Sequence, residues 1–251
     1  MLSDRGKYLV RLQSSFPFKL LLTNPIDART RYPNLLSRYL AWSKLREILD
    51  DLKINSVFDV GANRGQFASG LRKIGYTGWI ISYEPSPDDF TTLRSKFESD
   101  PLWKGHQIAL GCDNGTGSFN VALGNSCLSS FLRPRWADAK IKVVPVEVKR
   151  LDAVFVEALT GIDQPRVFLK MDTQGFDLKV IEGASGCLHR VLGLLSEIAV
   201  EPNYENMPTY LECLNIYERL GFRLKGLSEI AWNRNRGTLV EMDCLMIRNS
   251  D

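Results

Sequence analysis

The chain has 251 residues, of which 32 are Lys or Arg and 29 are Asp or Glu, so its formal net charge is +3. At about 150 residues per domain, this length allows one or two domains. Hydrophobic residues at 44% and charged residues at 24% are close to the averages of soluble globular proteins, which excludes a disordered or fibrous chain. The apolar runs, such as residues 20–22, fall far short of the roughly 20 residues that a bilayer span needs. The sequence therefore predicts no transmembrane segment.

The positive charge is concentrated at one end of the chain. Residues 1–50 contain nine basic and four acidic side chains, whereas the other 201 residues contain 23 basic and 25 acidic ones. A nucleic-acid-binding face is expected to be basic, so the nearly neutral main part predicts no nucleic-acid partner.

Cysteine usage and the first residues bear on the compartment. The five cysteines are odd in number and form no C-x-x-C pair, which argues against a disulfide scaffold and a zinc site. The opening MLSDRGKYLV lacks the apolar region of a secretory signal. We therefore expect a cytoplasmic protein.

The first fifth of the chain differs in pattern from the rest. It contains three prolines (Pro17, Pro25 and Pro33) and an apolar cluster at residues 16–22, and apolar residues then recur at spacings of three and four over 35–52. This predicts an N-terminal helical extension over residues 1–54 and a main domain over 55–251. The extension has three open roles: covering a pocket mouth, pairing with another subunit to form a homo-oligomer, or touching an anionic glycolipid surface. The prolines favour the first two.

From residue 56, short apolar runs alternate with helical stretches, as is typical of βαβ units and a parallel sheet. Strands are predicted at 57–60, 79–84, 106–110, 167–171, 192–200, 222–232 and 238–247, and helices at 66–74, from 87, 152–159, 176–184 and 208–220. Residues 111–150 are less regular and predict an inserted β element with strands at 118–122 and 143–149. The short turn 233–237 predicts that the last strand runs antiparallel. The fold class is α/β, with a doubly wound, mostly parallel seven-stranded sheet.

The turn after the first strand reads VFDVGANRGQ over residues 57–66. In a doubly wound sheet a ligand binds beyond this turn, where glycine lets the backbone close tightly, and Gly61 and Gly65 supply this. The dinucleotide fingerprint G-x-G-x-x-G is absent, because Asn63 stands at the second glycine position and no third glycine follows, and the P-loop pattern is also absent. The turn therefore predicts a nucleoside-sized pocket that is not built for a pyrophosphate.

Two acidic residues are candidates for cofactor contacts. Glu84 ends the second strand, where a carboxylate can accept hydrogen bonds from both ribose hydroxyls. Asp59 lies just before the glycine turn and suits a cofactor that carries an ammonium and a sulfonium. Structural alternatives remain open: Asp59 as an acid that holds the amides of its own turn, and Glu84 as an acid favoured by a helix N-terminus.

These motifs together resemble the class I S-adenosylmethionine-dependent methyltransferases, and more narrowly the FkbM family of O-methyltransferases. The resemblance covers about residues 55–248 and rests on DVGANRG at 59–65, YEPSP at 83–87, ALG at 109–111 and, most diagnostically, LKMDTQGFD at 169–177. It implies a Rossmann-like fold and S-adenosyl-L-methionine as the cofactor. It also implies that Asp59, Gly61, Asn63 and Gly65 wrap the methionine end, that Glu84 holds the ribose, and that Ala109 and Leu110 border the adenine. Asp177 departs from the family's usual Glu, and residues 1–50 have no counterpart.

The end of the fourth parallel strand is the predicted site of chemistry. Asp172 follows an apolar run, so we expect its carboxylate at the sheet edge as the base that takes a hydroxyl proton. Glu197 and Glu201 are second choices, and Asp172 and Glu197 are also candidates to share a divalent cation. A helix cap is the structural alternative for Asp172. Lys170 is expected to be an ion-pair partner. The two histidines, His106 and His189, fall in a strand and in a turn away from this edge.

The predicted function is transfer of a methyl group from S-adenosyl-L-methionine to a hydroxyl of a sugar, a glycan or a specialised metabolite, with the acceptor class implied by the resemblance alone. Two other functions stay open: a different nucleotide-cofactor enzyme, such as an NAD-linked oxidoreductase, and a non-catalytic scaffold of the same fold. Residues 125–131 form either a pocket-lining loop or a surface turn. Arg133, Arg135 and Trp136 are candidates to contact an anionic or sugar acceptor.

Overall fold

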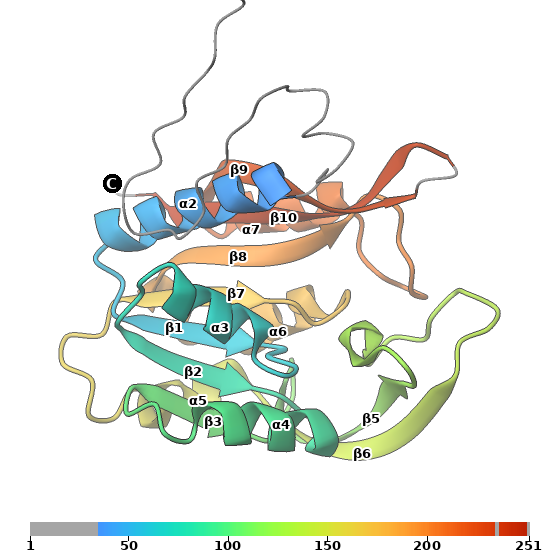
Figure 1. Cartoon of the computed structure of the whole chain (residues 1–251), viewed down its shortest axis with the longest axis horizontal. Coiled ribbons are helices and arrows are strands. Elements are labelled where there is room, and N and C mark those ends of the chain that lie inside the picture. Colours follow the sequence, from blue (N-terminus) through green and yellow to red (C-terminus); the bar gives the residue numbers. More distant parts are fainter. Residues whose placement is uncertain (1–34, 234–235, 250–251) are drawn as a thin grey trace, which may run out of the picture.

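A computed structural model describes residues 35–233 and 236–249. Its centre is a seven-stranded sheet in the order β3-β2-β1-β7-β8-β10-β9 (Figure 1). β10 lies between β8 and β9 and runs antiparallel to both, whereas the other strand pairs of this sheet are parallel. The predicted fold class, a Rossmann-like and mostly parallel sheet with an antiparallel last strand, is confirmed. The strands are β1 (Ser56–Val60), β2 (Trp79–Tyr83), β3 (Trp103–His106), β7 (Val167–Met171), β8 (Val191–Ala199), β9 (Phe222–Asn233) and β10 (Thr238–Arg248).

Helices cover both faces of this sheet because the central strands are apolar on both sides. Alternate residues of β1 point to opposite faces: Val57 belongs to one apolar core and Phe58 to the other. The first core contains side chains of α2 (Leu35–Asp51), α3 (Gln66–Lys73) and α4 (Pro87–Phe97), and the second contains those of α5 (Leu151–Ala158), α6 (Asp177–Gly183) and α7 (Tyr210–Arg219).

The predicted strand 106–110 is wrong as one element. β3 ends at His106 in the main sheet, and Ala109–Leu110 forms β4, which pairs with a different strand, β6 (Ile141–Lys149). Together with β5 (Gly115–Ala122), these strands form a second sheet in the order β4-β6-β5. Local apolar pattern could not show the break, because Ala109 and Leu110 are as buried in the second sheet as they would be in the first.

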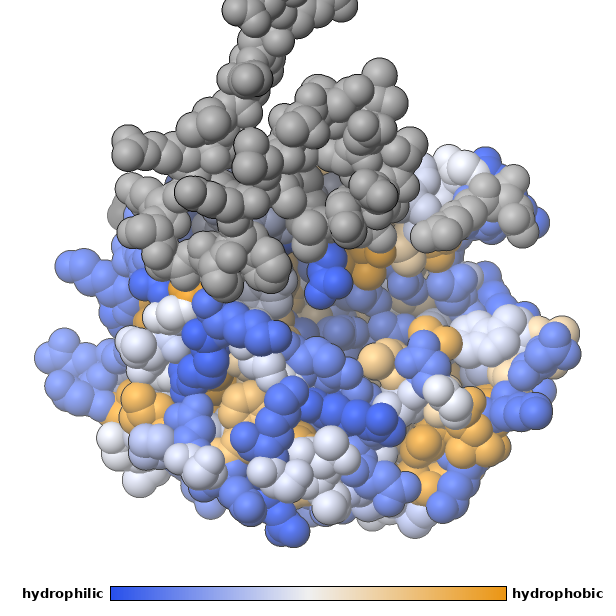
Figure 2. All heavy atoms as spheres, in the orientation of Figure 1, coloured by the Kyte–Doolittle hydropathy of each residue, from blue (hydrophilic) through white to orange (hydrophobic). Residues whose placement is uncertain are grey.

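This second sheet is the inserted β element predicted for residues 111–150, and it carries a loop that contains a short 3₁₀ turn, η1 (Ser126–Leu128). Phe119 and Val146 form its small core. Apolar atoms also gather on the outer surface over β5 and β6 (Figure 2). Leu123 and Val143 contribute to the exposed apolar surface of the chain, at 55% and 60% exposure.

Helix α2 packs as the predicted amphipathic helix. Leu45, Ile48 and Leu49 are buried at spacings of three and four, and Arg46 Nη1 donates to the carbonyl of Ile74 at 2.8 Å. The rest of the predicted N-terminal extension, including the apolar cluster at 16–22, lies outside the described residues, as do residues 234–235 of the predicted hairpin turn. No helix in the described part of the chain is long and apolar enough to cross a membrane.

Candidate active site

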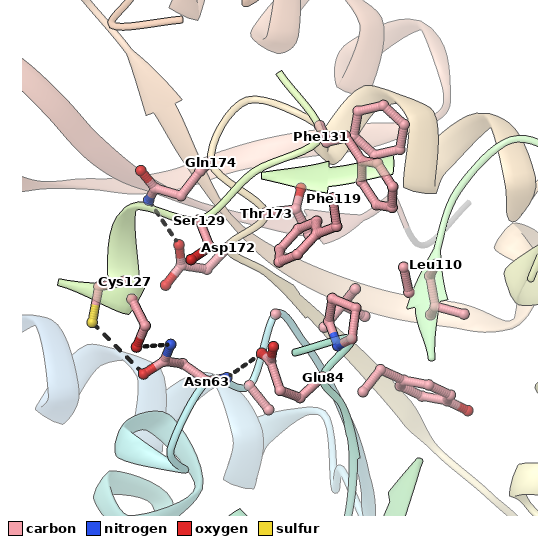
Figure 3. A pocket seen from close by; sticks show the side chains of 18 of the residues that line it. Asn63, Glu84, Leu110, Phe119, Cys127, Ser129, Phe131, Asp172, Thr173 and Gln174 are labelled. Carbon is pink, nitrogen blue, oxygen red and sulfur yellow. Dashed lines mark hydrogen bonds between the residues drawn. The ribbon is translucent and has the colours of Figure 1, made fainter. Parts of the chain in front are cut away.

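A cavity lies where β1, β2 and β7 end, bounded by the loops that follow these strands and by the second sheet. It holds about 830 Å³ of empty space, including the part that is open to solvent. Glu84 and Asn63 lie on one side, and Asp172 and Gln174 lie across from them (Figure 3). The cavity therefore sits at the sheet edge that the motif spacing predicts.

The turn after β1 requires its glycines. Gly61 has φ +74°, and a Cβ there would lie 2.0 Å from the carbonyl oxygen of Asp172. Gly65 has φ +76°, and a Cβ there would lie 2.5 Å from the ring of Phe97. Asn63 also has a positive φ, 46°, a conformation that Asn adopts more readily than most residues. Gly61 and Asn63 line the cavity, whereas Gly65 lies behind it against α4.

Four backbone amides of this turn, those of Gly61, Ala62, Asn63 and Gly65, are already paired inside the protein. The amides of Gly61 and Ala62 both donate to the carbonyl of Tyr83 at 3.0 Å, and the amide of Gly65 donates to the carbonyl of Ala62 at 2.9 Å. The amide of Asn63 donates to Glu84 Oε2 at 2.7 Å. Phosphate-binding turns hold their anion with free amides, and these four amides are not free to hold a pyrophosphate.

Glu84 is a buried carboxylate at the cavity wall, 5% exposed. Its two oxygens accept hydrogen bonds from the amides of Asn63 and Ser86, at 2.7 and 2.8 Å. Burial raises the pKa of Glu84 to about 7, against the opposing effect of these two hydrogen bonds. Each oxygen keeps a further lone pair, so the carboxylate can still accept two hydrogen bonds from a ligand.

Asp59 does not line the cavity but lies fully buried under it, where its Oδ1 is 3.0 Å from Lys170 Nζ. Lys170 does line the cavity and donates to the carbonyl of Gly61 at 3.1 Å. Burial alone would lower the pKa of Lys170, but the carboxylates of Asp59 and Asp172 outweigh it and raise the pKa. The predicted ion-pair role of Lys170 is thus what the structure shows, and Asp59 pairs with this cation instead of with the amides of its own turn.

Ala109 and Leu110, the predicted adenine neighbours, both line the cavity on the side opposite the glycine turn. They are buried, at 4% and 2% exposure, and the aromatic rings of Phe119, Phe131 and Phe176 also face the cavity. This part of the wall is apolar and can receive a flat, apolar group.

Three side chains meet at the end of β7. Asp172 lines the cavity with its side chain 39% exposed, and its Oδ1 accepts from Gln174 Nε2 at 3.2 Å. The same Nε2 donates to Glu197 Oε1 at 2.7 Å. Glu197 lies behind Gln174 and does not line the cavity, and burial followed by repulsion from Asp172 raises its pKa well above the usual value. Glu201 is turned elsewhere and accepts from Thr238 Oγ1 at 2.8 Å.

The comparison with known families agrees with this geometry. The family model described as "Methyltransferase FkbM domain" matches residues 59–224, which is more than half of the chain. The chain belongs to the FkbM methyltransferase family. This confirms the resemblance drawn from the sequence, and the protein is a methyltransferase.

Solved structures with a similar fold share little sequence with this methyltransferase. A putative S-adenosylmethionine dependent methyltransferase from Listeria monocytogenes is 8% identical, with 83% of this chain and 98% of that chain covered and a TM-score of 0.47. The methyltransferase domain of bacterial CtHen1 is 10% identical, with 85% and 100% covered and a TM-score of 0.47. A precorrin-6y C5,15-methyltransferase from Geobacter metallireducens is 10% identical, with 78% and 81% covered and a TM-score of 0.42. No curated protein matches the chain.

Asp177, which replaces the usual Glu of the family, shapes the loop that carries Asp172. It is buried, and it accepts hydrogen bonds from the amide and hydroxyl of Thr173 and from Ser196 Oγ at 2.6 Å. Its carboxylate therefore ties the β7–α6 loop of the methyltransferase to β8. The cap alternative for Asp172 is wrong, because α6 begins at Asp177, its N-cap residue is Phe176, and no side chain caps this helix end.

The loop over residues 125–131 lines the cavity of the methyltransferase, which confirms that alternative over a surface turn: Ser126, Cys127, Ser129 and Phe131 face the ligand space. At one end, Ser126 Oγ accepts from Asn63 Nδ2 at 3.0 Å and donates to Asp89 Oδ1 at 2.9 Å. At the other end, Ser130 Oγ donates to the carbonyl of Gln174 at 2.8 Å. We call residues 126–132 the strap, because they span the cavity from the glycine turn to Gln174.

Residues 133–136 lie outside the cavity lining and pack against the segment after β8. The ring of Trp136 meets that of Tyr204 edge-on, 5.3 Å between centroids, and the Arg133 side chain is 79% exposed, 3.9 Å from Glu205. Sequence reasoning missed Gln174 and Tyr204 as site residues. Gln174 lies inside the diagnostic D-T-Q-G-F block, which was a signal for it, whereas Tyr204 has no comparable motif around it.

Metal binding at the methyltransferase site has no support from side-chain geometry. Within residues 35–233 and 236–249, no group of three or more His, Cys, Asp and Glu side chains is arranged to hold a metal ion. His106 stacks on Tyr83 at 5.0 Å between centroids, and His189 lies in the 3₁₀ turn η2 (Leu188–Arg190); neither lines the cavity.

Proposed function

We propose that this methyltransferase uses S-adenosyl-L-methionine as methyl donor and methylates a hydroxyl group of a sugar, a glycan or a specialised metabolite. The supporting observation is that Glu84 lies beside a turn in which the amides of Gly61, Ala62 and Asn63 already donate inside the protein. A ribose diol can donate two hydrogen bonds to the open lone pairs of Glu84, whereas a pyrophosphate would find the amides of Gly61, Ala62 and Asn63 already in use. A nucleoside cofactor without phosphates fits these residues better than NAD does.

The cavity wall offers a distinct partner to each part of this cofactor. Glu84 receives the ribose, Ala109 and Leu110 border the adenine, and Gly61 and Asn63 lie at the methionine end. Asp59 acts on that end only through Lys170, since it is covered by the cavity floor. Gly65 acts by letting α4 approach the turn closely.

Asp172 is the base in this proposal. When bound, S-adenosyl-L-methionine supplies a methyl group on a sulfonium, and the carbon–sulfur bond breaks as the carbon–oxygen bond to the acceptor forms. Asp172 faces the cavity, where its carboxylate accepts the hydroxyl proton and aligns the hydroxyl oxygen; such a base contributes about 10²–10⁴-fold. Glu197 is the weaker candidate, because it lies behind Gln174 and its raised pKa keeps it protonated at higher pH.

Cofactor choice is tested by binding. Calorimetry with S-adenosylhomocysteine is expected to give a dissociation constant, and NAD is expected to give no heat at the same concentration. Binding of NAD alone would contradict the proposal and favour the oxidoreductase. A labelled-methyl assay against glycan and metabolite extracts then identifies the acceptor, and cofactor binding without any transfer would favour the non-catalytic scaffold.

The role of Asp172 is tested by Asp172→Asn, which keeps the shape of the side chain but cannot take a proton. Turnover is expected to fall about 10²–10⁴-fold while the affinity for S-adenosylhomocysteine stays within about twofold. Glu218→Gln, an exposed change on α7, serves as the control with normal turnover. Near-normal turnover of Asp172→Asn would end this assignment.

A further inference from the structure

Gln174 occupies an unusual position beside the site. Its side chain is 7% exposed, and its backbone has φ +52°, a left-handed conformation that Gln rarely adopts. Such a conformation costs of order 1–3 kcal/mol and persists where the surrounding contacts enforce it. In this protein the contacts are hydrogen bonds of Gln174, and they reach several different parts of the site.

The amide of Gln174 is fully used. Its two N–H bonds point at two carboxylates, with Nε2 at 3.2 Å from Asp172 Oδ1 and at 2.7 Å from Glu197 Oε1. Its oxygen accepts from Tyr204 Oη at 3.0 Å. This is the orientation that the amide must take, since the reverse would turn its oxygen toward both carboxylates.

Tyr204 links the same amide to the strap. Its hydroxyl lies 2.9 Å from the carbonyl oxygen of Leu128 and donates its one proton to either this carbonyl or Gln174 Oε1. Ser130 Oγ adds a bond from the strap to the backbone carbonyl of Gln174. The strap also reaches the glycine turn through Ser126, so one chain of contacts runs from the cofactor side of the cavity to the carboxylates.

We propose that Gln174 is a positioning residue for methyl transfer: its amide holds the carboxylates of Asp172 and Glu197 as one unit, with the strap and Tyr204 fixing the orientation of that amide. This inference rests on the proposed function, in which Asp172 takes the hydroxyl proton. Gln174 acts through Asp172 and does not itself exchange a proton with the acceptor.

The charges around the pair explain why a neutral double donor stands there. The groups that face the pair are mostly acidic: Asp177 of α6, Glu241 and Asp243 of β10, the hydroxyl of Tyr204 and the thiol of Cys127, with Lys170 of β7 as the nearby cation. Burial and repulsion from these acids raise the pKa of Glu197, and a donated hydrogen bond favours its ionised form. Gln174 thereby helps to keep the pair able to accept a proton.

The first test reads the carboxylates directly and needs no acceptor. Gln174→Met keeps the length of the side chain and removes both donors. In a ¹³C carboxyl NMR titration of the full chain with S-adenosylhomocysteine, the midpoint of the Glu197 signal is expected to move up by about one pH unit. An unchanged midpoint would overturn the proposal. Glu182→Gln, an exposed change on the neighbouring helix α6, is the control in which the midpoint stays in place.

The second test reads the reaction. The ascending limb of the kcat–pH profile of Gln174→Met is expected to move up by about one pH unit, with the KM for the cofactor unchanged. A uniform loss of rate at every pH would show a purely structural role. If Gln174→Met does not fold, Gln174→Glu keeps the size of the side chain and the acceptor for Tyr204. The same limb is then expected to move further, since one more acid lies in direct contact with both carboxylates.

The two proposals fail separately. If the NMR midpoint moves but the wild-type chain methylates no acceptor, the proposed function is wrong and the carboxylate unit stands. If the chain transfers methyl groups and neither the midpoint nor the limb moves, the role of Gln174 is wrong and the proposed function stands.

Discussion

Replacing Glu84 by Gln tests whether this carboxylate is the ribose-binding group, and the structure sets the size of the effect. Burial raises its pKa from 4.5 to about 7 in the native state. Over this range the native protein holds a proton that the unfolded chain has lost, so stability falls as the pH rises and levels off above about pH 7. The fall from Glu84 alone is about 2.5 kcal/mol between pH 5 and pH 8.

Gln does not titrate, so the Glu84→Gln variant should lack this part of the pH dependence. The variant also loses an acceptor for the amide of Asn63 or Ser86, and this lowers its stability by an amount that does not change with pH. Urea unfolding at pH 5, 6, 7 and 8 measures both effects, and the difference between the two proteins should shrink by about 2.5 kcal/mol toward pH 8. Parallel stability curves would refute the assignment of the raised pKa to Glu84.

Cofactor binding gives the second readout for this variant. The ionised carboxylate accepts both ribose hydroxyls, so Glu84→Gln should weaken S-adenosylhomocysteine binding at pH 8 at least about tenfold. Asp243→Asn is the matched control: burial also raises the pKa of Asp243 to about 7, but this residue does not line the cavity. It should change the pH dependence of stability and leave the affinity intact. Unchanged affinity in Glu84→Gln would exclude a ribose contact.

Two further substitutions test residues that support the site. Gly61→Ala should lower the free energy of unfolding by more than about 2 kcal/mol, because the new methyl would lie 2.0 Å from the carbonyl oxygen of Asp172. Gly124→Ala is the control, because Gly124 has a similar φ of +92° but no neighbour within 4 Å, and equal losses of the two variants in urea unfolding would argue against the close approach at Gly61. Lys170→Met should lower the free energy of unfolding by about 3–5 kcal/mol, because it leaves Asp59 buried without its cation. Adding Asp59→Leu should recover much of this loss, and a double variant no more stable than Lys170→Met would contradict a dominant ion pair.

The local sequence was sufficient to predict those parts of the site whose structure depends on a short segment of the chain. The glycine turn at 61–65 follows from an apolar strand that ends in a tight bend, and the position of Glu84 follows from the next strand. Because parallel strands end at a common edge, the spacing of these motifs also placed Asp172 at the same cavity. The family block at 169–177 pointed in the same direction, and the family match confirms it.

Pairings between distant segments were not readable from the sequence. The chain leaves the main sheet after His106, and no local signal distinguishes a buried Ala109 in one sheet from the same residue in another. The contact of Asp59 with Lys170 joins residues over 100 positions apart, and it converts a predicted ligand contact into a buried ion pair. Position in the chain cannot show which acids are covered, and burial decides which of them titrate near neutral pH.

The sequence by itself determined the sheet, the glycine turn and the family, since these depend on apolar period, backbone conformation and short motifs. Only the tertiary structure decided how the carboxylates are arranged, because the arrangement depends on one amide, Gln174, and on how the chain folds around it. Asp172 faces the cavity and Glu197 lies behind that amide. The sequence placed Asp172 before Glu197 as a candidate base, and only the folded protein shows that the two lie at different depths from the cavity.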